Sequence, residues 1–247
     1  MSRAEVDAAI AAFPAACGRD LMVGVLASQK TLYGAGNSKP RRYPMPDKIA
    51  GIFPSDPFRK LPVVNLVHYA GGVATDLLDL DRVAGDRCHG FQFNGEWPAP
   101  AALKRLIEAR ASRDATTRLV LQLGPAILAN NDLIANAARA LRAYQGLATD
   151  VLLDASGGAG KGMDLFHAGW AAQEIGGRNG YAFKFGLAGG LDADSITEAV
   201  AMHLAEGFSC DAEGRLRDEA PGGGNLDLGK VAAYIAAAGR AVSGGAT

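Results

Sequence analysis

The sequence predicts an α/β fold built on parallel strands, and two observations support this. From residue 88 onward, short apolar runs alternate with segments of helical periodicity. Such alternation is typical of parallel strands joined by right-handed crossovers. The length of 247 residues also fits one (β/α) barrel, which typically needs about 250. We therefore expect residues 1–247 to form a single TIM-type barrel domain, with an open, doubly wound sheet as the alternative.

Seven segments have the length and apolar character of buried strands. They are residues 21–28, 62–70, 88–94, 118–124, 150–156, 181–187 and 208–212. A standard barrel closes with eight strands, so one strand is not evident. Residues 1–20 instead have a helical stripe formed by Val6, Ile10 and Phe13. We thus expect an atypical N-terminus.

Helical patterns fill the intervals between the strands. Apolar residues recur at helical spacing in residues 103–107, 133–144, 166–170 and 196–204. Candidate N-caps precede three of these patterns: Asn131 or Asp132, Asp164, and Asp194. Residues 34–61 are too long for an ordinary connection. This segment could contain a helix at 47–53, an extra short strand or an active-site loop.

Charge and cysteine content exclude several classes of protein. The 25 basic and 26 acidic side chains nearly balance, so no electrostatic surface for nucleic acid or anionic lipid is expected. Cys17, Cys88 and Cys210 are odd in number and widely spaced, which argues against a disulfide framework or a zinc cluster. No segment approaches the roughly 18 apolar residues of a membrane span, and the first 20 residues do not resemble a signal peptide. We expect a cytoplasmic protein without metal or cofactor; a homo-oligomer remains open.

Two strand-to-helix segments are the most informative: residues 151–164 (VLLDASGGAGKGMD) and 181–191 (YAFKFGLAGGL). The first brings Asp154 to the carboxyl end of a strand, where barrel active sites lie. The second ends at Gly189 and Gly190, whose amides can approach an anion closely at the usual phosphate position of a barrel. Alternatively, Asp154 only caps a strand end or forms a salt bridge. The two glycines would then form only a tight turn that needs positive φ at one of them.

The glycines after Asp154 fit neither common nucleotide motif. A P-loop requires Ser or Thr after its Gly-Lys pair, whereas Gly162 follows Lys161. A dinucleotide fingerprint starting at Gly158 would have Met163 in place of its third glycine. We therefore interpret this segment as a flexible loop after a strand that presents Asp154.

Polar residues within the strands add further candidates. Gln92 and Asn94 alternate with phenylalanines, so they are expected inside the barrel, where they could bind substrate or hydrogen-bond within the core. His68 lies near a strand end and could face the active mouth. Lys184, in an apolar strand, could form a Schiff base with a carbonyl substrate. The alternative is an ion pair with a carboxylate such as Asp154.

Several of these motifs resemble phosphoribosylanthranilate isomerase, a barrel enzyme of tryptophan synthesis. The similar stretches are VLLDASGGAGKGMD, FGLAGGLDADSI, GFQFNGEWPAPAALKRL, VGVLASQKTLYGAGNSKPRRYP and PGGGNLDLGKVAAYIAAA. The resemblance covers most of residues 21–242 and is strict at 151–164 and 185–196. It implies a phosphate-binding barrel that converts an aminoaldose into an aminoketose, an Amadori rearrangement, by proton transfers.

The resemblance also implies roles for individual residues. Asp154 corresponds to the general acid, Arg42 to the arginine that faces the carboxylate of the substrate, and Gly189 and Gly190 to the phosphate turn. Gln92 is retained from the family's strand, and Asn94 stands where the family has histidine.

Two departures from the family pattern concern the rest of the site. The family's general base is a cysteine after its first strand, but residues 21–28 match its second strand. Cys17 has no preceding apolar strand, and we expect it to be a buried or capping residue. The last phosphate loop is altered as well. Gly214, Arg215 or Arg217 could supply contacts there, and the alternative is a solvated charged loop. The sequence thus leaves three functions open: an isomerase-like enzyme, a non-catalytic sugar-phosphate-binding or scaffold protein, and a Schiff-base enzyme.

Overall fold

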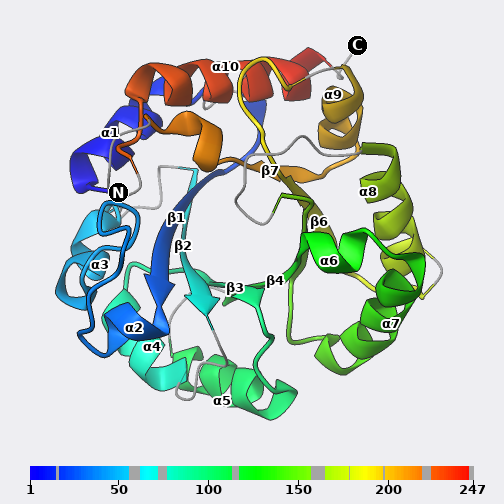
Figure 1. Ribbon diagram of the computed structural model, residues 1–247, viewed down its shortest axis with the longest axis horizontal. Helices are drawn as coiled ribbons and strands as arrows, with labels where there is room; N and C mark the ends of the chain where they lie inside the picture. Colours follow the sequence, from blue (N-terminus) through cyan, green and yellow to red (C-terminus); the bar gives the residue numbers. More distant parts are fainter. Residues whose placement is uncertain are drawn as a thin grey trace.

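The computed structural model of the protein describes residues 1–14, 17–55, 62–71, 77–112, 117–156, 165–177, 179–196, 198–218 and 224–244. Seven parallel strands form one sheet in the order β1 to β7, and the sheet curls around a central axis (Figure 1). The strands are β1 (Leu21–Ser28), β2 (Val63–Gly71), β3 (Gly90–Gly95), β4 (Arg118–Leu123), β5 (Asp150–Asp154), β6 (Lys184–Ala188) and β7 (Ser209–Asp211). The expected TIM-type fold is confirmed, and each of the seven expected segments overlaps one strand.

Helices surround the sheet and pack on its outer face (Figure 1). They are α1 (Arg3–Ala12), α2 (Gln29–Leu32), α3 (Pro46–Ile52), α4 (Leu77–Ala84), α5 (Pro100–Arg110), α6 (Pro125–Leu128), α7 (Asn131–Leu141), α8 (Leu165–Ala172), α9 (Glu198–Ala205) and α10 (Leu228–Gly244). Shorter helical turns are η2 (Arg142–Tyr144), η3 (Gln173–Gly177) and η4 (Gly214–Leu216). None of the helices in the described ranges is long and apolar enough to cross a membrane.

Alternation along each strand divides the apolar residues into two layers. Outward residues such as Val67, Phe91 and Leu121 pack against the helices in the main core. A smaller inner cluster fills the barrel, formed by Leu66, Val120, Leu152 and Ala188 with Met22 and Val64 packed against it. The inner face is therefore apolar in its middle layer. Its polar residues lie toward both ends of the strands, with Arg118, Asp150 and Lys184 toward the amino ends.

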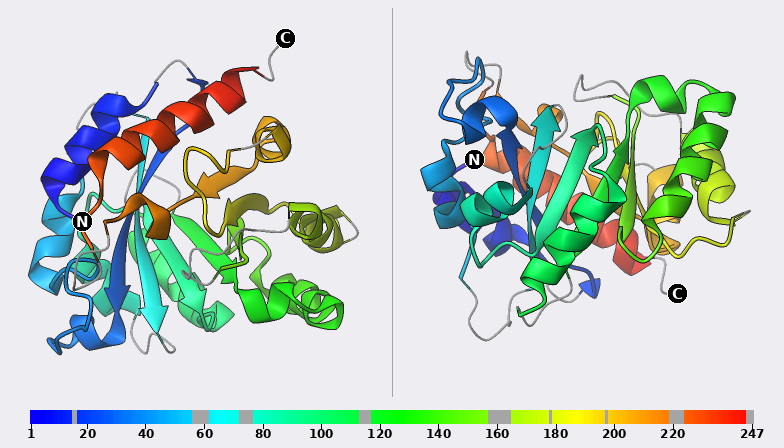
Figure 2. Two further views of the ribbon diagram at one scale, coloured as in Figure 1. Left: turned by 45° about the horizontal axis from the view of Figure 1, so that its top comes forward. Right: turned by 90° about the horizontal axis from the view of Figure 1, so that it is seen from below.

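The sheet is open between its first and last strands, because β1 and β7 are not paired in the described residues. α1 and α10 lie side by side across this seam (Figure 2). A second apolar cluster beneath them includes Tyr234, Ile235 and Leu216, with Phe13 packed against it. The guanidinium of Arg19 donates to the carbonyl oxygens of Leu204 at 3.0 Å and Phe208 at 2.5 Å. Helices and one arginine thus join the two edges where an eighth strand would stand.

The helix predictions were mostly right, with errors at the caps. α1 has a capping box between Ser2 and Glu5, and α3 confirms the helix expected at 47–53. The cap of α7 is Asn130, and not Asn131 or Asp132 as expected. The Asn130 side chain accepts from the backbone amides of Asp132 and Leu133. Asp194 is not a cap either, because it lies in a turn four residues before α9 begins. Asp164 lies outside the described residues.

Candidate functional site

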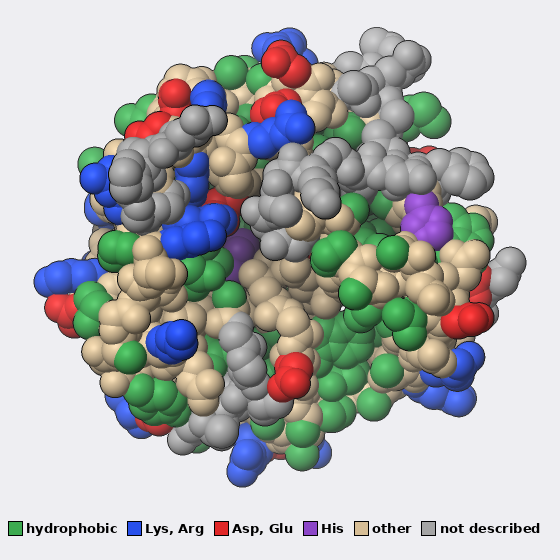
Figure 3. Space-filling model, viewed as in Figure 1, with side chains coloured by type: hydrophobic (Ala, Val, Ile, Leu, Met, Phe, Trp, Pro, Cys, Tyr) green, Lys and Arg blue, Asp and Glu red, His purple; other side chains and the backbone are tan. Residues whose placement is uncertain are grey.

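The candidate site lies inside the sheet at the carboxyl ends of its strands. Residues in register on parallel strands face the same side, so one pairing series follows the inner face around the barrel. Toward the carboxyl ends, the polar residues of this face are Ser28, His68, Gln92, Asn94, Gln122, Asp154 and Asp211. Down the barrel, basic, acidic and histidine side chains gather near the centre of the molecule (Figure 3). We call the seven polar residues named above, at the carboxyl ends of the strands, the mouth.

Asp154 is held rigidly at the end of β5. Its Oδ2 accepts from the amide of Gln122 on β4 at 2.9 Å, and its Oδ1 accepts from the backbone amide of Ser156 at 2.9 Å and from its hydroxyl at 3.1 Å. The residue is buried. Donors from two directions thus fix the orientation of the carboxyl group.

The glycine turn after β6 lies directly beside Asp154. Ala188 is in register with Asp154, and its carbonyl accepts from the amide of Ala155 at 3.2 Å. Gly189 and Gly190 have φ of 131° and 62°, so both adopt conformations that side chains disfavour. A Cβ at Gly189 would lie 3.3 Å from the amide nitrogen of Ser156. The two most informative segments of the sequence therefore form one continuous surface.

Gln92 and Asn94 both face the interior from β3, as expected. The amide of Gln92 donates to Oδ1 of Asn94 at 2.9 Å. Oε1 of Gln92 is buried without a hydrogen-bond partner among the described residues. An unpaired buried carbonyl oxygen is costly, which marks this position as one that a ligand hydroxyl or amine could complete.

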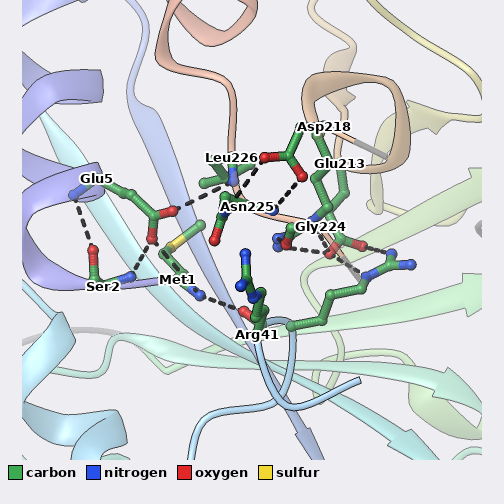
Figure 4. A network of polar contacts seen from close by, with 11 residues as sticks. Met1, Ser2, Glu5, Arg41, Glu213, Asp218, Gly224, Asn225 and Leu226 are labelled. Atoms are coloured by element: carbon green, nitrogen blue, oxygen red, sulfur yellow. Dashed lines mark hydrogen bonds and ion pairs between the residues drawn. The ribbon is translucent and has the colours of Figure 1, made fainter. Parts of the chain in front are cut away.

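Arg42 reaches the mouth, but its guanidinium binds a protein carboxylate. Nε and one terminal nitrogen of Arg42 donate to the two oxygens of Glu213, and Arg217 donates to Glu213 at 3.0 Å (Figure 4). Burial raises the pKa of Glu213, but the hydrogen bonds and charges of the two arginines lower it below its usual range. The expected contact of Arg42 with a substrate carboxylate is thus replaced, in this structure, by an internal ion pair.

The last-strand loop is occupied by internal contacts as well. Gly214 begins η4 directly after Glu213. Arg215 donates to Asp192 at 2.8 Å, and Arg217 also donates to the carbonyl of Gly224 at 3.0 Å. The two arginines that could have bound phosphate are therefore engaged by protein groups.

A polar network joins this loop to the N-terminal helix (Figure 4). Glu5 accepts from the backbone amide of Leu226 at 3.4 Å and lies 3.8 Å from the amino group of Met1. That amino group donates to the carbonyl of Arg41 at 3.0 Å. The helix that replaces a strand at the seam thus anchors the loop that carries Arg42.

Asp211 is the functional candidate that the sequence analysis missed. It ends β7 in register with Ala188, which places it on the inner face. Burial raises its pKa; His68 lowers it, and the charges of Glu213 and Asp154 raise it further. The signal was present in the sequence, because Asp211 ends the last expected strand as Asp154 ends an earlier one.

Lys184 and Cys17 lie away from the mouth. Lys184 is exposed at the amino end of β6, in register with Asp150, and lines a cavity of about 1090 Å³ at that end of the sheet. The ion pair of Lys184 with Asp154 is therefore wrong, because the two residues lie at opposite strand ends. The desolvation that Schiff-base chemistry requires is also lacking, because Lys184 is exposed. Cys17 precedes the amino end of β1 and is partly exposed, so it cannot face Asp154. The described residues contain no group of three or more metal-binding side chains suited to an ion.

Comparisons with known proteins establish the fold. No protein-family model matches the chain, and no curated protein matches it. A solved structure of a phosphoribosyl anthranilate isomerase from Thermococcus kodakaraensis is similar, with a TM-score of 0.55 and 15% sequence identity. The similarity covers 95% of this chain and 92% of the other. The chain thus shares the barrel fold of this structure.

Proposed function

We propose that the mouth binds a phosphorylated aminoaldose and isomerises it to the aminoketose, with Asp154 as the general acid. The observation that carries this proposal is the register of Asp154 with Ala188, which sets an anchored carboxyl beside the turn at Gly189 and Gly190. A phosphate on that turn would bring the sugar ring next to Asp154. Proton transfer by a positioned carboxyl contributes typically 10²- to 10⁴-fold to such a reaction.

The other mouth residues suit a small polyhydroxylated ligand. Gln92 offers a buried carbonyl oxygen, and Asn94 lies beside it on the same strand. Gly214 follows the last strand, where a barrel commonly completes its phosphate site. Arg42 would meet a substrate carboxylate only by exchanging Glu213 for it, so substrates with and without that carboxylate must be compared.

Turnover by the purified protein tests the proposal. We expect wild type to convert phosphoribosylanthranilate or a related phosphorylated aminoaldose, and Asp154→Asn to lose at least 100-fold in kcat while it still binds. Stabilisation by phosphate esters in a thermal-shift assay, without turnover of any such substrate, would favour a non-catalytic binding protein. Growth of a tryptophan auxotroph lacking the isomerase decides whether the anthranilate compound itself is a substrate.

A further inference from the structure

We propose that Asp211 is the catalytic base of this site and that His68 is its positioning partner. This inference rests on the proposed function and supplies the proton acceptor that a cysteine provides in the family. Three groups of observations support it: the level of Asp211 on the sheet, its surroundings, and the position of the His68 ring.

Asp211 and Asp154 lie at one level of the barrel, facing the same interior. Ala188 is in register with both of them, so they are two strands apart on the inner face. Neighbouring strands are about 4.8 Å apart, which puts the two backbones within about 10 Å. Only the methyl group of Ala188 stands between them on the sheet. A small substrate held there would have one carboxyl group on each side.

The surroundings of Asp211 favour proton acceptance. The residue is partly exposed, so a ligand in the interior can reach it. Burial raises the pKa of its carboxyl, with Glu213 and Asp154 adding to the effect and His68 opposing it. A carboxylate with a raised pKa is a stronger base than an ordinary aspartate. Glu213 is already neutralised by two arginines, so it does not compete for this role.

The His68 ring occupies the space that a side chain at Gly24 of β1 would fill. A Cβ at Gly24 would lie 2.4 Å from both Cε1 and Nε2 of His68, so the imidazole covers Gly24. The residue is 7% exposed, and its Nε2 is buried without a hydrogen-bond partner in the described ranges. Burial lowers the pKa of His68, whereas the charges of Asp211 and Glu213 raise it. The ring therefore extends from β2 over β1, which is the first strand of the sheet.

The proton transfers balance without any further reactant. Asp154 gives its proton to the ring oxygen as the C1–O bond breaks and the nitrogen lone pair forms the iminium. Asp211 then takes the proton from C2; the C–H pair forms the C1=C2 bond and the iminium π pair returns to nitrogen. Asp211 finally returns that proton to C1, while the C2 hydroxyl gives its proton to Asp154 and becomes the ketone. Both carboxyl groups end as they began.

Four variants and the wild type test this inference. Asp211→Asn is expected to lower kcat at least 100-fold with KM changed less than threefold. Cys210→Ser, on the outer face of the same strand, is expected to keep wild-type kcat. His68→Gln removes the group that lowers the pKa of Asp211, so the acid limb of the kcat/KM profile is expected to move to higher pH. Gly24→Ala, which displaces the ring, is expected to move it in the same direction.

The outcomes separate this inference from the proposed function. Turnover by wild type together with kcat within threefold for Asp211→Asn would overturn the role of Asp211 and leave the isomerase intact. An unmoved acid limb in His68→Gln would overturn the role of His68. Absence of turnover in wild type overturns both proposals. If Asp211→Asn does not fold, Asp211→Glu is measured instead. This variant keeps a carboxylate and is expected to retain measurable turnover. Total inactivity of the folded Glu variant would overturn the role of Asp211 as the base.

Discussion

The side-chain amide of Gln122 on β4 donates a hydrogen bond of 2.9 Å to Oδ2 of Asp154 on β5. Ser156 donates to the other oxygen, so donors from two directions orient the carboxyl group. The sequence does not indicate Gln122 as a candidate, because it is a single polar residue in an otherwise apolar strand with no motif around it. Its role arises because neighbouring strands bring the two side chains to the same face.

Replacing Gln122 by leucine tests the importance of this contact. Gln122→Leu removes one donor from the carboxylate that forms as Asp154 gives up its proton. It is expected to lower kcat by about tenfold to a hundredfold, since a hydrogen bond to a charged group contributes about 1.5–3 kcal/mol. Steady-state kinetics measure the effect. Gln145→Leu makes the same change at an exposed position and is expected to have wild-type kinetics. Equal kcat in the two variants would contradict an orienting role.

Asp211→Asn is expected to stabilise the protein at neutral pH even as it removes activity. Burial raises the pKa of Asp211 in the folded state, so the unfolded chain, with an aspartate pKa near 3.9, ionises first. The stability that the protonated group contributes is present at low pH and is lost as pH rises through the raised pKa. Melting temperatures from pH 4 to pH 8 should show a gain for the variant that grows with pH.

Asp192→Asn is the control for Asp211→Asn, because it is expected to change the melting temperature in the opposite direction. Burial raises the pKa of Asp192, but hydrogen bonds from Arg215 and Ser195 lower it below its usual value. Its contribution to stability is present above the unfolded pKa and is lost as pH falls through the lowered one. The Asp192 variant should therefore melt below wild type at neutral pH and approach it in acid. A pH-independent difference for both variants would argue against these shifts.

A buried ion pair joins Arg110 of α5 to Asp81 of α4, between the helices and the outer face of the sheet. Arg110 is 3% exposed and also donates to Thr117 at 3.1 Å. Asp81→Ala leaves a buried guanidinium without its carboxylate and is expected to cost about 3–5 kcal/mol in urea unfolding. Asp79→Ala, which breaks the exposed pair with Arg82 on the same helix, is expected to cost at most about 1 kcal/mol. Similar costs for the two variants would be the contrary result.

Cys88 is expected to resist alkylation in the folded protein. Burial raises the pKa of its thiol to about 11, and its Sγ lies 3.0 Å from the carbonyl oxygen of Gly90. Because the thiolate is the reactive form, iodoacetamide at pH 8 should modify Cys88 only after denaturation. Mass spectrometry can follow it against the partly exposed Cys17. Labelling of Cys88 at the rate of Cys17 would show that this strand end opens readily.

Local patterns in the sequence determined the strands and most helices. Each strand has its own apolar run, and the helix at 47–53 begins at Pro46, so neither depends on distant residues. Asp154 could be placed at the carboxyl end of a strand for the same reason. The cap of α7 was misplaced by one residue, because adjacent Asn130, Asn131 and Asp132 are all favourable caps.

Tertiary structure alone decided which side chains meet. The sequence does not show at which end of the sheet Lys184 and Asp154 lie relative to each other. It therefore allows an ion pair between them, although Lys184 lies at the amino end of its strand. Arg42 faces Glu213 because a loop and a strand end far apart in sequence converge at the mouth. Strand alternation is local, whereas register and the closing of the seam depend on the packing of the entire chain. Register sets Asp211 at the level of Asp154, two strands away on the inner face.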